Sequence, residues 1–167
     1  MPEYKIAETF SSINGEGRKA GQLSFFIRFT GCNLDCSYCD TKWANLPDAP
    51  FTIMTDTEII ERVLDSGITN VTVTGGEPLI QKDIIYLLDG LLKIGRYVEI
   101  ETNGAADIEP IIKMGSIRPS LTMDYKLPSS GMEKHMLLSN FELLDSRDTV
   151  KTVTVYETPN NCASYMK

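Results

Sequence analysis

The sequence predicts an α/β fold whose largely parallel sheet forms an open layer or an incomplete barrel. Short runs of β-branched and aromatic residues alternate along the chain with segments in which apolar residues recur at helical spacing. This alternation favours parallel strands joined by right-handed helical crossovers. The length of 167 residues fits one domain, and no repeat or low-complexity segment interrupts the pattern. We therefore expect one domain over residues 1–167.

The predicted strands are short and suit a buried sheet, as in the run LSFFIRF at the second of them. They occupy residues 6–13, 23–29, 71–74, 98–102, 121–125 and 150–155. The predicted helices occupy residues 55–64, 81–94 and 108–114, with a helix or turn over residues 136–144. The first helix carries a capping pattern, because Glu58 stands three residues after Thr55.

Charge and hydropathy narrow the class of protein. The formal net charge of −7 and the lack of a long Lys or Arg run argue against direct binding of a nucleic-acid backbone. No apolar run approaches the roughly 20 residues of a membrane-spanning helix, and residues 1–5 lack the pattern of a secretory signal. We expect a cytoplasmic protein without a membrane or nucleic-acid partner.

Three of the four cysteines crowd onto one long loop, over residues 31–50, that follows the second strand. Clustered thiols in a reducing compartment bind metal more often than they form disulfides. Three thiolates on a four-iron cubane leave one iron open for a substrate or cofactor, so Cys32, Cys36 and Cys39 are the predicted cluster ligands. The alternative is zinc completed by Asp40 or Cys162, although the paired CxxC knuckles of zinc ribbons are missing.

Three further segments close predicted strands with glycine or polar residues. The sequence TGGEP over residues 74–78 offers an unobstructed backbone and a carboxylate for an ammonium group, although it is also typical of a tight turn. The carboxylates and amide of residues 99–103 either bind a ligand or are simply solvated. Asp124, Tyr125 and Lys126 either line a ligand site or end a strand in water.

The cysteine spacing and the glycine-rich segment together resemble the radical S-adenosylmethionine superfamily, whose signature is CxxxCxxC with an aromatic residue, here Tyr38, before the last cysteine. The resemblance implies an incomplete β/α barrel of the radical S-adenosylmethionine type. It also implies a four-iron four-sulfur cluster, whose open iron binds the methionine part of the cofactor and whose electron yields a 5'-deoxyadenosyl radical. The implied cofactor-binding residues are Tyr38, Gly75, Gly76, Glu77, Asp124, Tyr125 and Lys126.

The chain is also similar to one family within that superfamily, the 7-carboxy-7-deazaguanine synthases of queuosine biosynthesis. The similarity is carried by ETFSSINGEG over residues 8–17, FIRFTGCN over residues 26–33 and CDT over residues 39–41, and it extends from residue 6 to about residue 151. It implies a lyase that converts 6-carboxy-5,6,7,8-tetrahydropterin to 7-carboxy-7-deazaguanine with loss of ammonia.

The same family resemblance implies ligands and partners. Arg28 would meet the substrate carboxylate, although a lone Arg in an apolar strand is also typical of one half of an ion pair. Thr41 would bind Mg²⁺. The implied substrate-binding residues are Ile13, Asn14, Gly15, Arg28 and Thr74. The implied partners are an electron donor such as flavodoxin or ferredoxin and a second copy of the chain in a homodimer.

Other functions share part of this pattern. A glycyl-radical-enzyme activase has both CxxxCxxC and GGEP, but the INGEG and CDT segments match the pterin enzymes instead. A cluster or zinc protein without activity is the other alternative. Residues 152–167 form an atypical tail, because family members continue there with a further strand and pocket residues. We therefore expect slow cofactor cleavage that is largely uncoupled from product.

Overall fold

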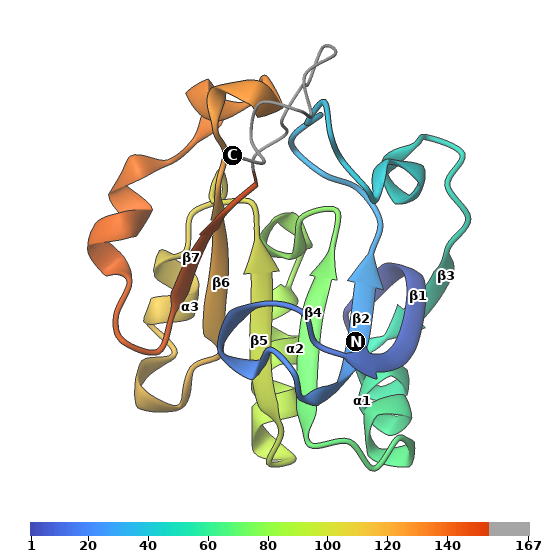
Figure 1. The fold of residues 1–167 in the computed structure, drawn as a ribbon. Coiled ribbons are helices and arrows are strands. Elements are labelled where there is room, and N and C mark those ends of the chain that lie inside the picture. Colours follow the sequence, from blue (N-terminus) through green and yellow to red (C-terminus); the bar gives the residue numbers. More distant parts are fainter. Residues whose placement is uncertain (154–167) are drawn as a thin grey trace, which may run out of the picture.

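Seven strands form one sheet in the order β3-β1-β2-β4-β5-β6-β7 in the computed structural model, which describes residues 1–153 (Figure 1). The strands are β1 (Glu3–Ile13), β2 (Leu23–Phe29), β3 (Thr52–Thr55), β4 (Asn70–Gly75), β5 (Tyr97–Thr102), β6 (Ser120–Tyr125) and β7 (Thr149–Thr152). From β2 to β7 all neighbours pair in parallel, whereas β1 pairs antiparallel with both β2 and β3. The predicted α/β fold with an open, incomplete barrel is confirmed.

The helices connect the parallel strands and lie behind the sheet in Figure 1. They are α1 (Asp56–Asp65), α2 (Ile84–Lys93) and α3 (Glu109–Ile112). Short 3-10 turns occupy η1 (Gly17–Lys19), η2 (Lys42–Asn45), η3 (Pro78–Ile80), η4 (Gly115–Ile117), η5 (Pro128–Ser130), η6 (Glu133–His135) and η7 (Leu138–Leu143). None of the helices within residues 1–153 is long and apolar enough to cross a membrane.

The two faces of the sheet differ in chemistry because successive side chains of a strand point to opposite faces. Side chains on the face toward the helices are buried and apolar, for example Ile27 on β2, Val73 on β4 and Ile100 on β5. The other face carries polar side chains, for example Thr74 on β4, Glu101 on β5 and Asp124 on β6. None of the three α-helices lies over this face in Figure 1. The segment after β1, drawn in blue, crosses in front of the lower parts of β4 and β5 on this open face.

Local sequence signals explain where α1 begins. The Thr55 hydroxyl accepts a hydrogen bond from the Glu58 backbone N–H at 3.2 Å. The Glu58 carboxylate in return accepts from the Thr55 backbone N–H at 2.7 Å, which completes the predicted capping box. Such a box satisfies backbone donors that a helix start otherwise leaves without partners.

Several predicted boundaries shift in the structure. Strand β3 was not expected, because its four residues are too few to show a clear period. Helix α2 begins at Ile84, not at residue 81, because Asp83 adopts a left-handed φ of 60° that a helix cannot continue through. The segment 136–144 forms the 3-10 turn η7, and β7 ends at Thr152, with residues 154 and 155 outside the described part.

Candidate active site

A cavity of about 420 Å³ opens on the polar face at the carboxyl ends of the parallel strands. It gathers most of the side chains predicted for a site from segments far apart in the sequence. The predicted residues that line it are Asn14, Gly15, Arg28, Cys32, Cys36, Tyr38, Cys39, Thr41, Thr74, Gly75, Gly76, Asp124 and Lys126. Ile13, Glu77 and Tyr125 do not line it.

The cysteine loop leaves the end of β2 and is tied to the segment after β6. The Ser37 backbone N–H donates to the Ser130 carbonyl at 3.0 Å, and the Ser37 hydroxyl donates to the Ser129 carbonyl at 2.7 Å. Cys36 is buried, and burial raises the pKa of its thiol and of the Cys32 thiol. Both thiols are therefore protonated near neutral pH, and a bound metal would displace those protons.

The three thiols fit a cluster better than a single metal ion. Within residues 1–153, no three His, Cys, Asp or Glu side chains converge closely enough to hold one ion. A cubane does not need such convergence, because each thiolate binds a different iron. Of the two residues offered as a fourth zinc ligand, Asp40 accepts the Thr41 hydroxyl at 2.8 Å, and Cys162 lies outside the described residues.

The two glycines at the end of β4, Gly75 and Gly76, lie against backbone. A Cβ on Gly76 would stand 1.7 Å from the Gly31 carbonyl oxygen, and one on Gly75 would stand 2.3 Å from the Phe29 carbonyl oxygen. Their missing side chains therefore make room for the end of β2 and the start of the cysteine loop, a contact that the sequence argument did not foresee. Both glycines still line the cavity, so their contact with a cofactor stays a prediction.

Glu77 is fully buried behind the cavity and is saturated by donors. Its carboxylate accepts from the backbone N–H groups of Leu79 at 3.0 Å and Asn103 at 2.7 Å, and from the Thr102 hydroxyl at 2.9 Å. Burial raises the pKa of Glu77, and these three hydrogen bonds oppose that rise. The Asn103 amide lies 3.6 Å from the Cys32 sulfur, so Glu77 supports the cysteine loop through Asn103.

Arg28 forms the ion pair that one of its two sequence interpretations expected, and its binding of a substrate carboxylate stays a prediction. Its Nε lies 2.8 Å from a carboxylate oxygen of Glu8, so it forms an ion pair, and its side chain also lines the cavity. One terminal nitrogen donates to the Thr41 hydroxyl at 3.3 Å. The predicted carboxylate-binding and Mg²⁺-binding residues are thus neighbours.

Asn14 is buried beneath the segment that crosses the open face. Its side-chain amide donates to Glu99 at 2.9 Å and to Thr72 at 3.4 Å. Glu99, only 2% exposed, also accepts from the Thr122 hydroxyl at 2.6 Å and the Arg18 backbone N–H at 3.2 Å. Glu99 therefore anchors this segment. Ile13, by contrast, is 60% exposed and does not line the cavity.

Asp124 and Lys126 form a buried ion pair at the end of β6, with 2.6 Å between Nζ and Oδ2. Burial lowers the pKa of Lys126, but its hydrogen bond to Asp124 and the charges of Asp124, Cys36 and Tyr38 together outweigh that effect and raise the pKa. The other Asp124 oxygen and the Tyr38 hydroxyl are buried and have no partner within residues 1–153. A bound ligand could satisfy them. Tyr125 instead packs edge-on against Phe141, with ring centroids 5.7 Å apart.

Glu101 belongs to the segment 99–103 that the sequence offered as either ligand-binding or solvated. It lines the cavity and accepts the Thr74 hydroxyl at 2.7 Å, and burial raises the pKa of its carboxyl group. The structure also adds two residues that the sequence did not single out. Glu16 and Lys151 form an ion pair across the cavity mouth and both line it. Lys151 on β7 is the register partner of Asp124 on β6. No motif or spacing in the sequence singles Lys151 out as a site residue. His135, the one histidine of the sequence, is exposed.

Comparison with known proteins identifies the class. A model of the Radical SAM superfamily matches residues 26–125, which include the cysteine loop, the glycine turn and the strands from β4 to β6. The chain therefore belongs to the radical S-adenosylmethionine superfamily. The crystal structure of QueE from Escherichia coli shares the fold, with a TM-score of 0.65 and 22% identity over 91% of this chain and 85% of that one.

Curated relatives identify the family. A 7-carboxy-7-deazaguanine synthase from Clostridium acetobutylicum is 54% identical over 151 residues, which are 90% of this chain and 68% of the relative. A protein of the same name from Methanospirillum hungatei is 42% identical over 89% of this chain and 60% of its own length. This chain belongs to the 7-carboxy-7-deazaguanine synthase family of radical S-adenosylmethionine enzymes, and it spans about two thirds of the length of these relatives.

Proposed function

We propose that this chain converts 6-carboxy-5,6,7,8-tetrahydropterin to 7-carboxy-7-deazaguanine. The reaction breaks a carbon–nitrogen bond and releases ammonia, with no net oxidation or reduction of the substrate. The observation that carries the proposal is one cavity lined by three free thiols, by Arg28 and by the Asn14–Gly15 turn. Family membership supports the same reaction.

Cys32, Cys36 and Cys39 would hold a four-iron four-sulfur cluster, and the opposite wall of the cavity would hold S-adenosylmethionine. Together these groups supply one-electron chemistry that can remove a hydrogen atom from carbon. The chain positions the cofactor through the backbone of Gly75 and Gly76. The unpartnered Asp124 oxygen and the Tyr38 hydroxyl provide further polar contacts.

Arg28 would bind the substrate carboxylate with its terminal guanidinium nitrogens, because its Nε is already held by Glu8. Thr74 and Glu101 lie near the ends of neighbouring strands, and the Thr74 hydroxyl donates its proton to Glu101. Both side chains would therefore present acceptor oxygens to N–H groups of the pterin ring. The Asn14 side chain is fully used, because its amide donates to Glu99 and Thr72 and its oxygen accepts from the Glu16 backbone N–H at 3.1 Å. Its segment would therefore meet the substrate through Gly15.

We further propose Mg²⁺ at the Thr41 hydroxyl, with substrate and water oxygens as its other ligands. Asp40 supports this assignment because its carboxylate lies 2.8 Å from that hydroxyl. An ion there would sit beside Arg28, so both cations would act on the same substrate carboxylate.

The remaining assignments follow from the family resemblance. We propose a cytoplasmic protein with one radical S-adenosylmethionine domain that acts as a homodimer. A small electron donor such as flavodoxin or ferredoxin would reduce the cluster. Exposed Asn33 and Asp35 place the cysteine loop at the surface, where such a donor could approach it.

Anaerobic turnover of the reconstituted chain tests the reaction. The proposal predicts 7-carboxy-7-deazaguanine when 6-carboxytetrahydropterin, S-adenosylmethionine and a reductant are supplied. The matched control is the parent chain without the pterin, which should form no deazapurine. Cofactor cleavage without product, at every substrate concentration, would contradict the assigned substrate. A glycyl radical formed on an added protein substrate would favour the activase alternative.

A further inference from the structure

A second cavity, of about 690 Å³, lies at the opposite end of the sheet from the cysteine loop, where β5 and β6 begin. Its walls come from η1, the turn between α2 and β5, η4, and Arg147 before β7. Five cationic side chains line it, namely Arg18, Lys19, Arg96, Arg118 and Arg147. Such a gathering is unexpected in a chain whose formal net charge is −7.

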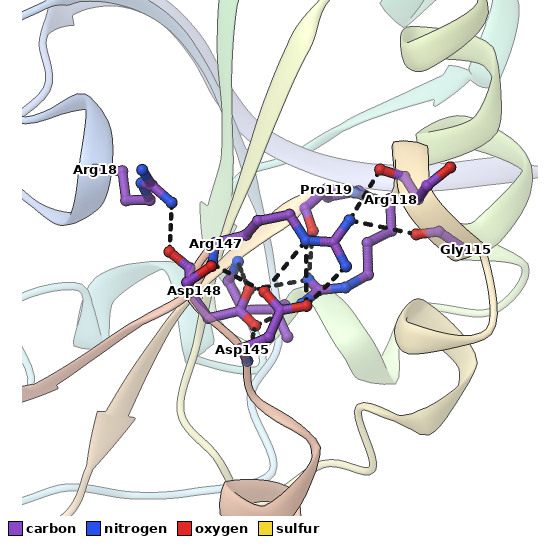
Figure 2. Close-up of polar contacts among 10 residues, drawn as sticks. Arg18, Gly115, Arg118, Pro119, Asp145, Arg147 and Asp148 are labelled. Carbon is purple, nitrogen blue, oxygen red and sulfur yellow. Dashed lines mark hydrogen bonds and ion pairs between the residues drawn. The ribbon is translucent and has the colours of Figure 1, made fainter.

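Two of the five cations are neutralised by neighbouring carboxylates (Figure 2). Arg118 is buried and pairs with Asp148 through two hydrogen bonds of 2.9 and 2.5 Å. Arg147 pairs with Asp145 at 2.7 Å and donates to the Ser116 carbonyl at 2.9 Å. This ion-pair cluster, defined as Arg118, Arg147, Asp145 and Asp148, forms one rigid wall of the cavity.

The other three cations have no carboxylate partner within residues 1–153. Arg18 donates to the Ser146 carbonyl, Lys19 lies over the Tyr97 ring at 4.5 Å, and Arg96 forms no ion pair. The buried Nε atom of Arg96 also lacks a hydrogen-bond partner in the described chain. Buried polar atoms are normally satisfied, so this donor on the cavity wall is available to a ligand.

The cavity also contains a negatively charged side chain that could repel an anionic ligand. Glu99 is the carboxylate that lines the cavity, and it accepts hydrogen bonds from Asn14, Thr122 and the Arg18 backbone. Its oxygens are therefore occupied by protein donors, and its side chain is almost fully covered. The remaining walls are apolar, with Leu92 and Val98 beside Ile117, which is 70% exposed.

We propose that this cavity binds a phosphorylated organic molecule, with its phosphates on Arg18, Lys19 and Arg96 and its organic part against Ile117 and Leu92. Guanidinium forks match phosphate oxygens in planar, two-pronged geometry, and the volume falls within the range of small-molecule sites. Nothing in this assignment depends on the proposed reaction of the chain.

A ligand in the cation-lined cavity would affect the cavity beside the cysteine loop, because one segment of the chain lines both. Asn14, Gly15 and Glu16 line the cavity beside the cysteine loop, whereas Arg18 and Lys19 line this one. In the chain, Gly17 alone stands between Glu16, which lines the first cavity, and Arg18, which lines the second. A phosphate held by Arg18 and Lys19 would restrict this segment, and we expect slower exchange of its amide hydrogens.

Calorimetry on the reconstituted chain saturated with S-adenosylmethionine tests the site, because saturation keeps adenine nucleotides out of the cofactor cavity. The probes are ATP, inorganic tripolyphosphate and adenosine. We expect one ATP per chain, and roughly tenfold or greater weakening in a Lys19→Gln, Arg96→Gln double variant, from two lost charged hydrogen bonds. The charge-matched control is Lys82→Gln with Lys134→Gln, two exposed lysines far from the cavity in sequence.

The probes separate the sources of the phosphate. ATP that binds more tightly than tripolyphosphate supports a ligand whose organic part lies on the apolar wall, and equal binding of the two overturns the assigned contact with Ile117 and Leu92. Hydrogen exchange of the peptide around residues 14–22 should slow with ATP in the parent but not in the double variant. The proposal is overturned if neither phosphate probe binds at about 1 mM. It is also overturned if both double variants bind equally, or if that peptide gains no protection.

Discussion

The two faces of the sheet are built from alternate residues of the same strands, yet one face packs against the helices and the other lines the candidate active site. On β2, Ile27 is fully buried under the helices, whereas the next residue, Arg28, lines the candidate active site on the open face. On β5, Ile100 and Glu101 divide in the same way. Apolar burial on one face stabilises the fold, which leaves the other free to hold polar groups that contribute little to stability and much to binding.

The polar face is itself ordered by buried hydrogen bonds. Glu99 anchors the segment after β1 by accepting a hydrogen bond from Asn14. Glu77 anchors the end of β5 by accepting one from the Asn103 backbone N–H. Each of these carboxylates accepts three hydrogen bonds, so each is satisfied although it is buried. The comparison therefore predicts three kinds of mutational effect, on backbone packing, on stability and on binding.

The largest mutational effect is expected at Gly76, where the end of β4 packs against the start of the cysteine loop. In Gly76→Ala the new Cβ would stand 1.7 Å from the Gly31 carbonyl oxygen, so the loop must move. We expect loss of bound iron after reconstitution and a lower melting temperature. The matched control is Gly15→Ala, whose Cβ meets no atom within 4 Å and which should keep its iron. Full iron content in Gly76→Ala would show that the loop tolerates the displacement.

A large stability effect is expected on the helix-covered face. Ile27→Ala removes a fully buried side chain and should lower the free energy of unfolding by about 2–5 kcal/mol. Leu23→Ala, on the same strand but 49% exposed, should cost much less. Urea denaturation of the two variants measures the difference. Equal losses would mean that exposure on β2 does not decide stability.

A binding effect is expected on the open face. Arg28→Ala should weaken pterin binding by on the order of 2–5 kcal/mol, or roughly 30-fold to several thousand-fold, because a charged partner of the carboxylate is lost. Cofactor cleavage and unfolding free energy should change little. Arg28→Lys keeps the charge but loses the planar guanidinium fork. Its pterin affinity should therefore lie between the affinities of the parent chain and of Arg28→Ala. Equal weakening of cofactor and substrate would contradict the assignment of Arg28.

The smallest effect at neutral pH is expected from a polar atom within the apolar layer. The Tyr4 hydroxyl donates to the Asp83 carbonyl at 3.0 Å, and burial raises the pKa of Tyr4 to about 12. Its proton is held more tightly in the folded state, so stability should fall as pH rises from about 10 to about 12. Tyr4→Phe should cost about 1 kcal/mol at pH 7. Alkaline denaturation curves that stay parallel for parent and variant would refute this linkage.

Sequence reasoning succeeds where a signal is local. The alternation of strands and helices, the capping box of Thr55 and Glu58, and the cysteine spacing all depend on residues close together in the chain. The same reasoning places polar groups at the ends of strands. The parallel register then gathers them at one edge, so most of the predicted site residues line one cavity.

Sequence reasoning fails where a partner is distant. Glu77 was expected to face a ligand, but its acceptors are used by Thr102 and Asn103, which stand on another strand. The tight approach of Gly76 to Gly31 is likewise invisible until β2 and β4 are paired. The cation-lined cavity brings Arg18 next to the loop before β7, and no periodicity or motif joins those segments.

Iron counting tests the central claim most directly, because the polar face has its proposed function only if the three thiols hold a cluster. After anaerobic reconstitution, the parent chain should contain about four irons and about four sulfides. Cys32→Ala, Cys36→Ala and Cys39→Ala should each lose them, and Cys162→Ala should keep them. One zinc per chain with no iron, or unchanged iron in any of the first three variants, would contradict the account.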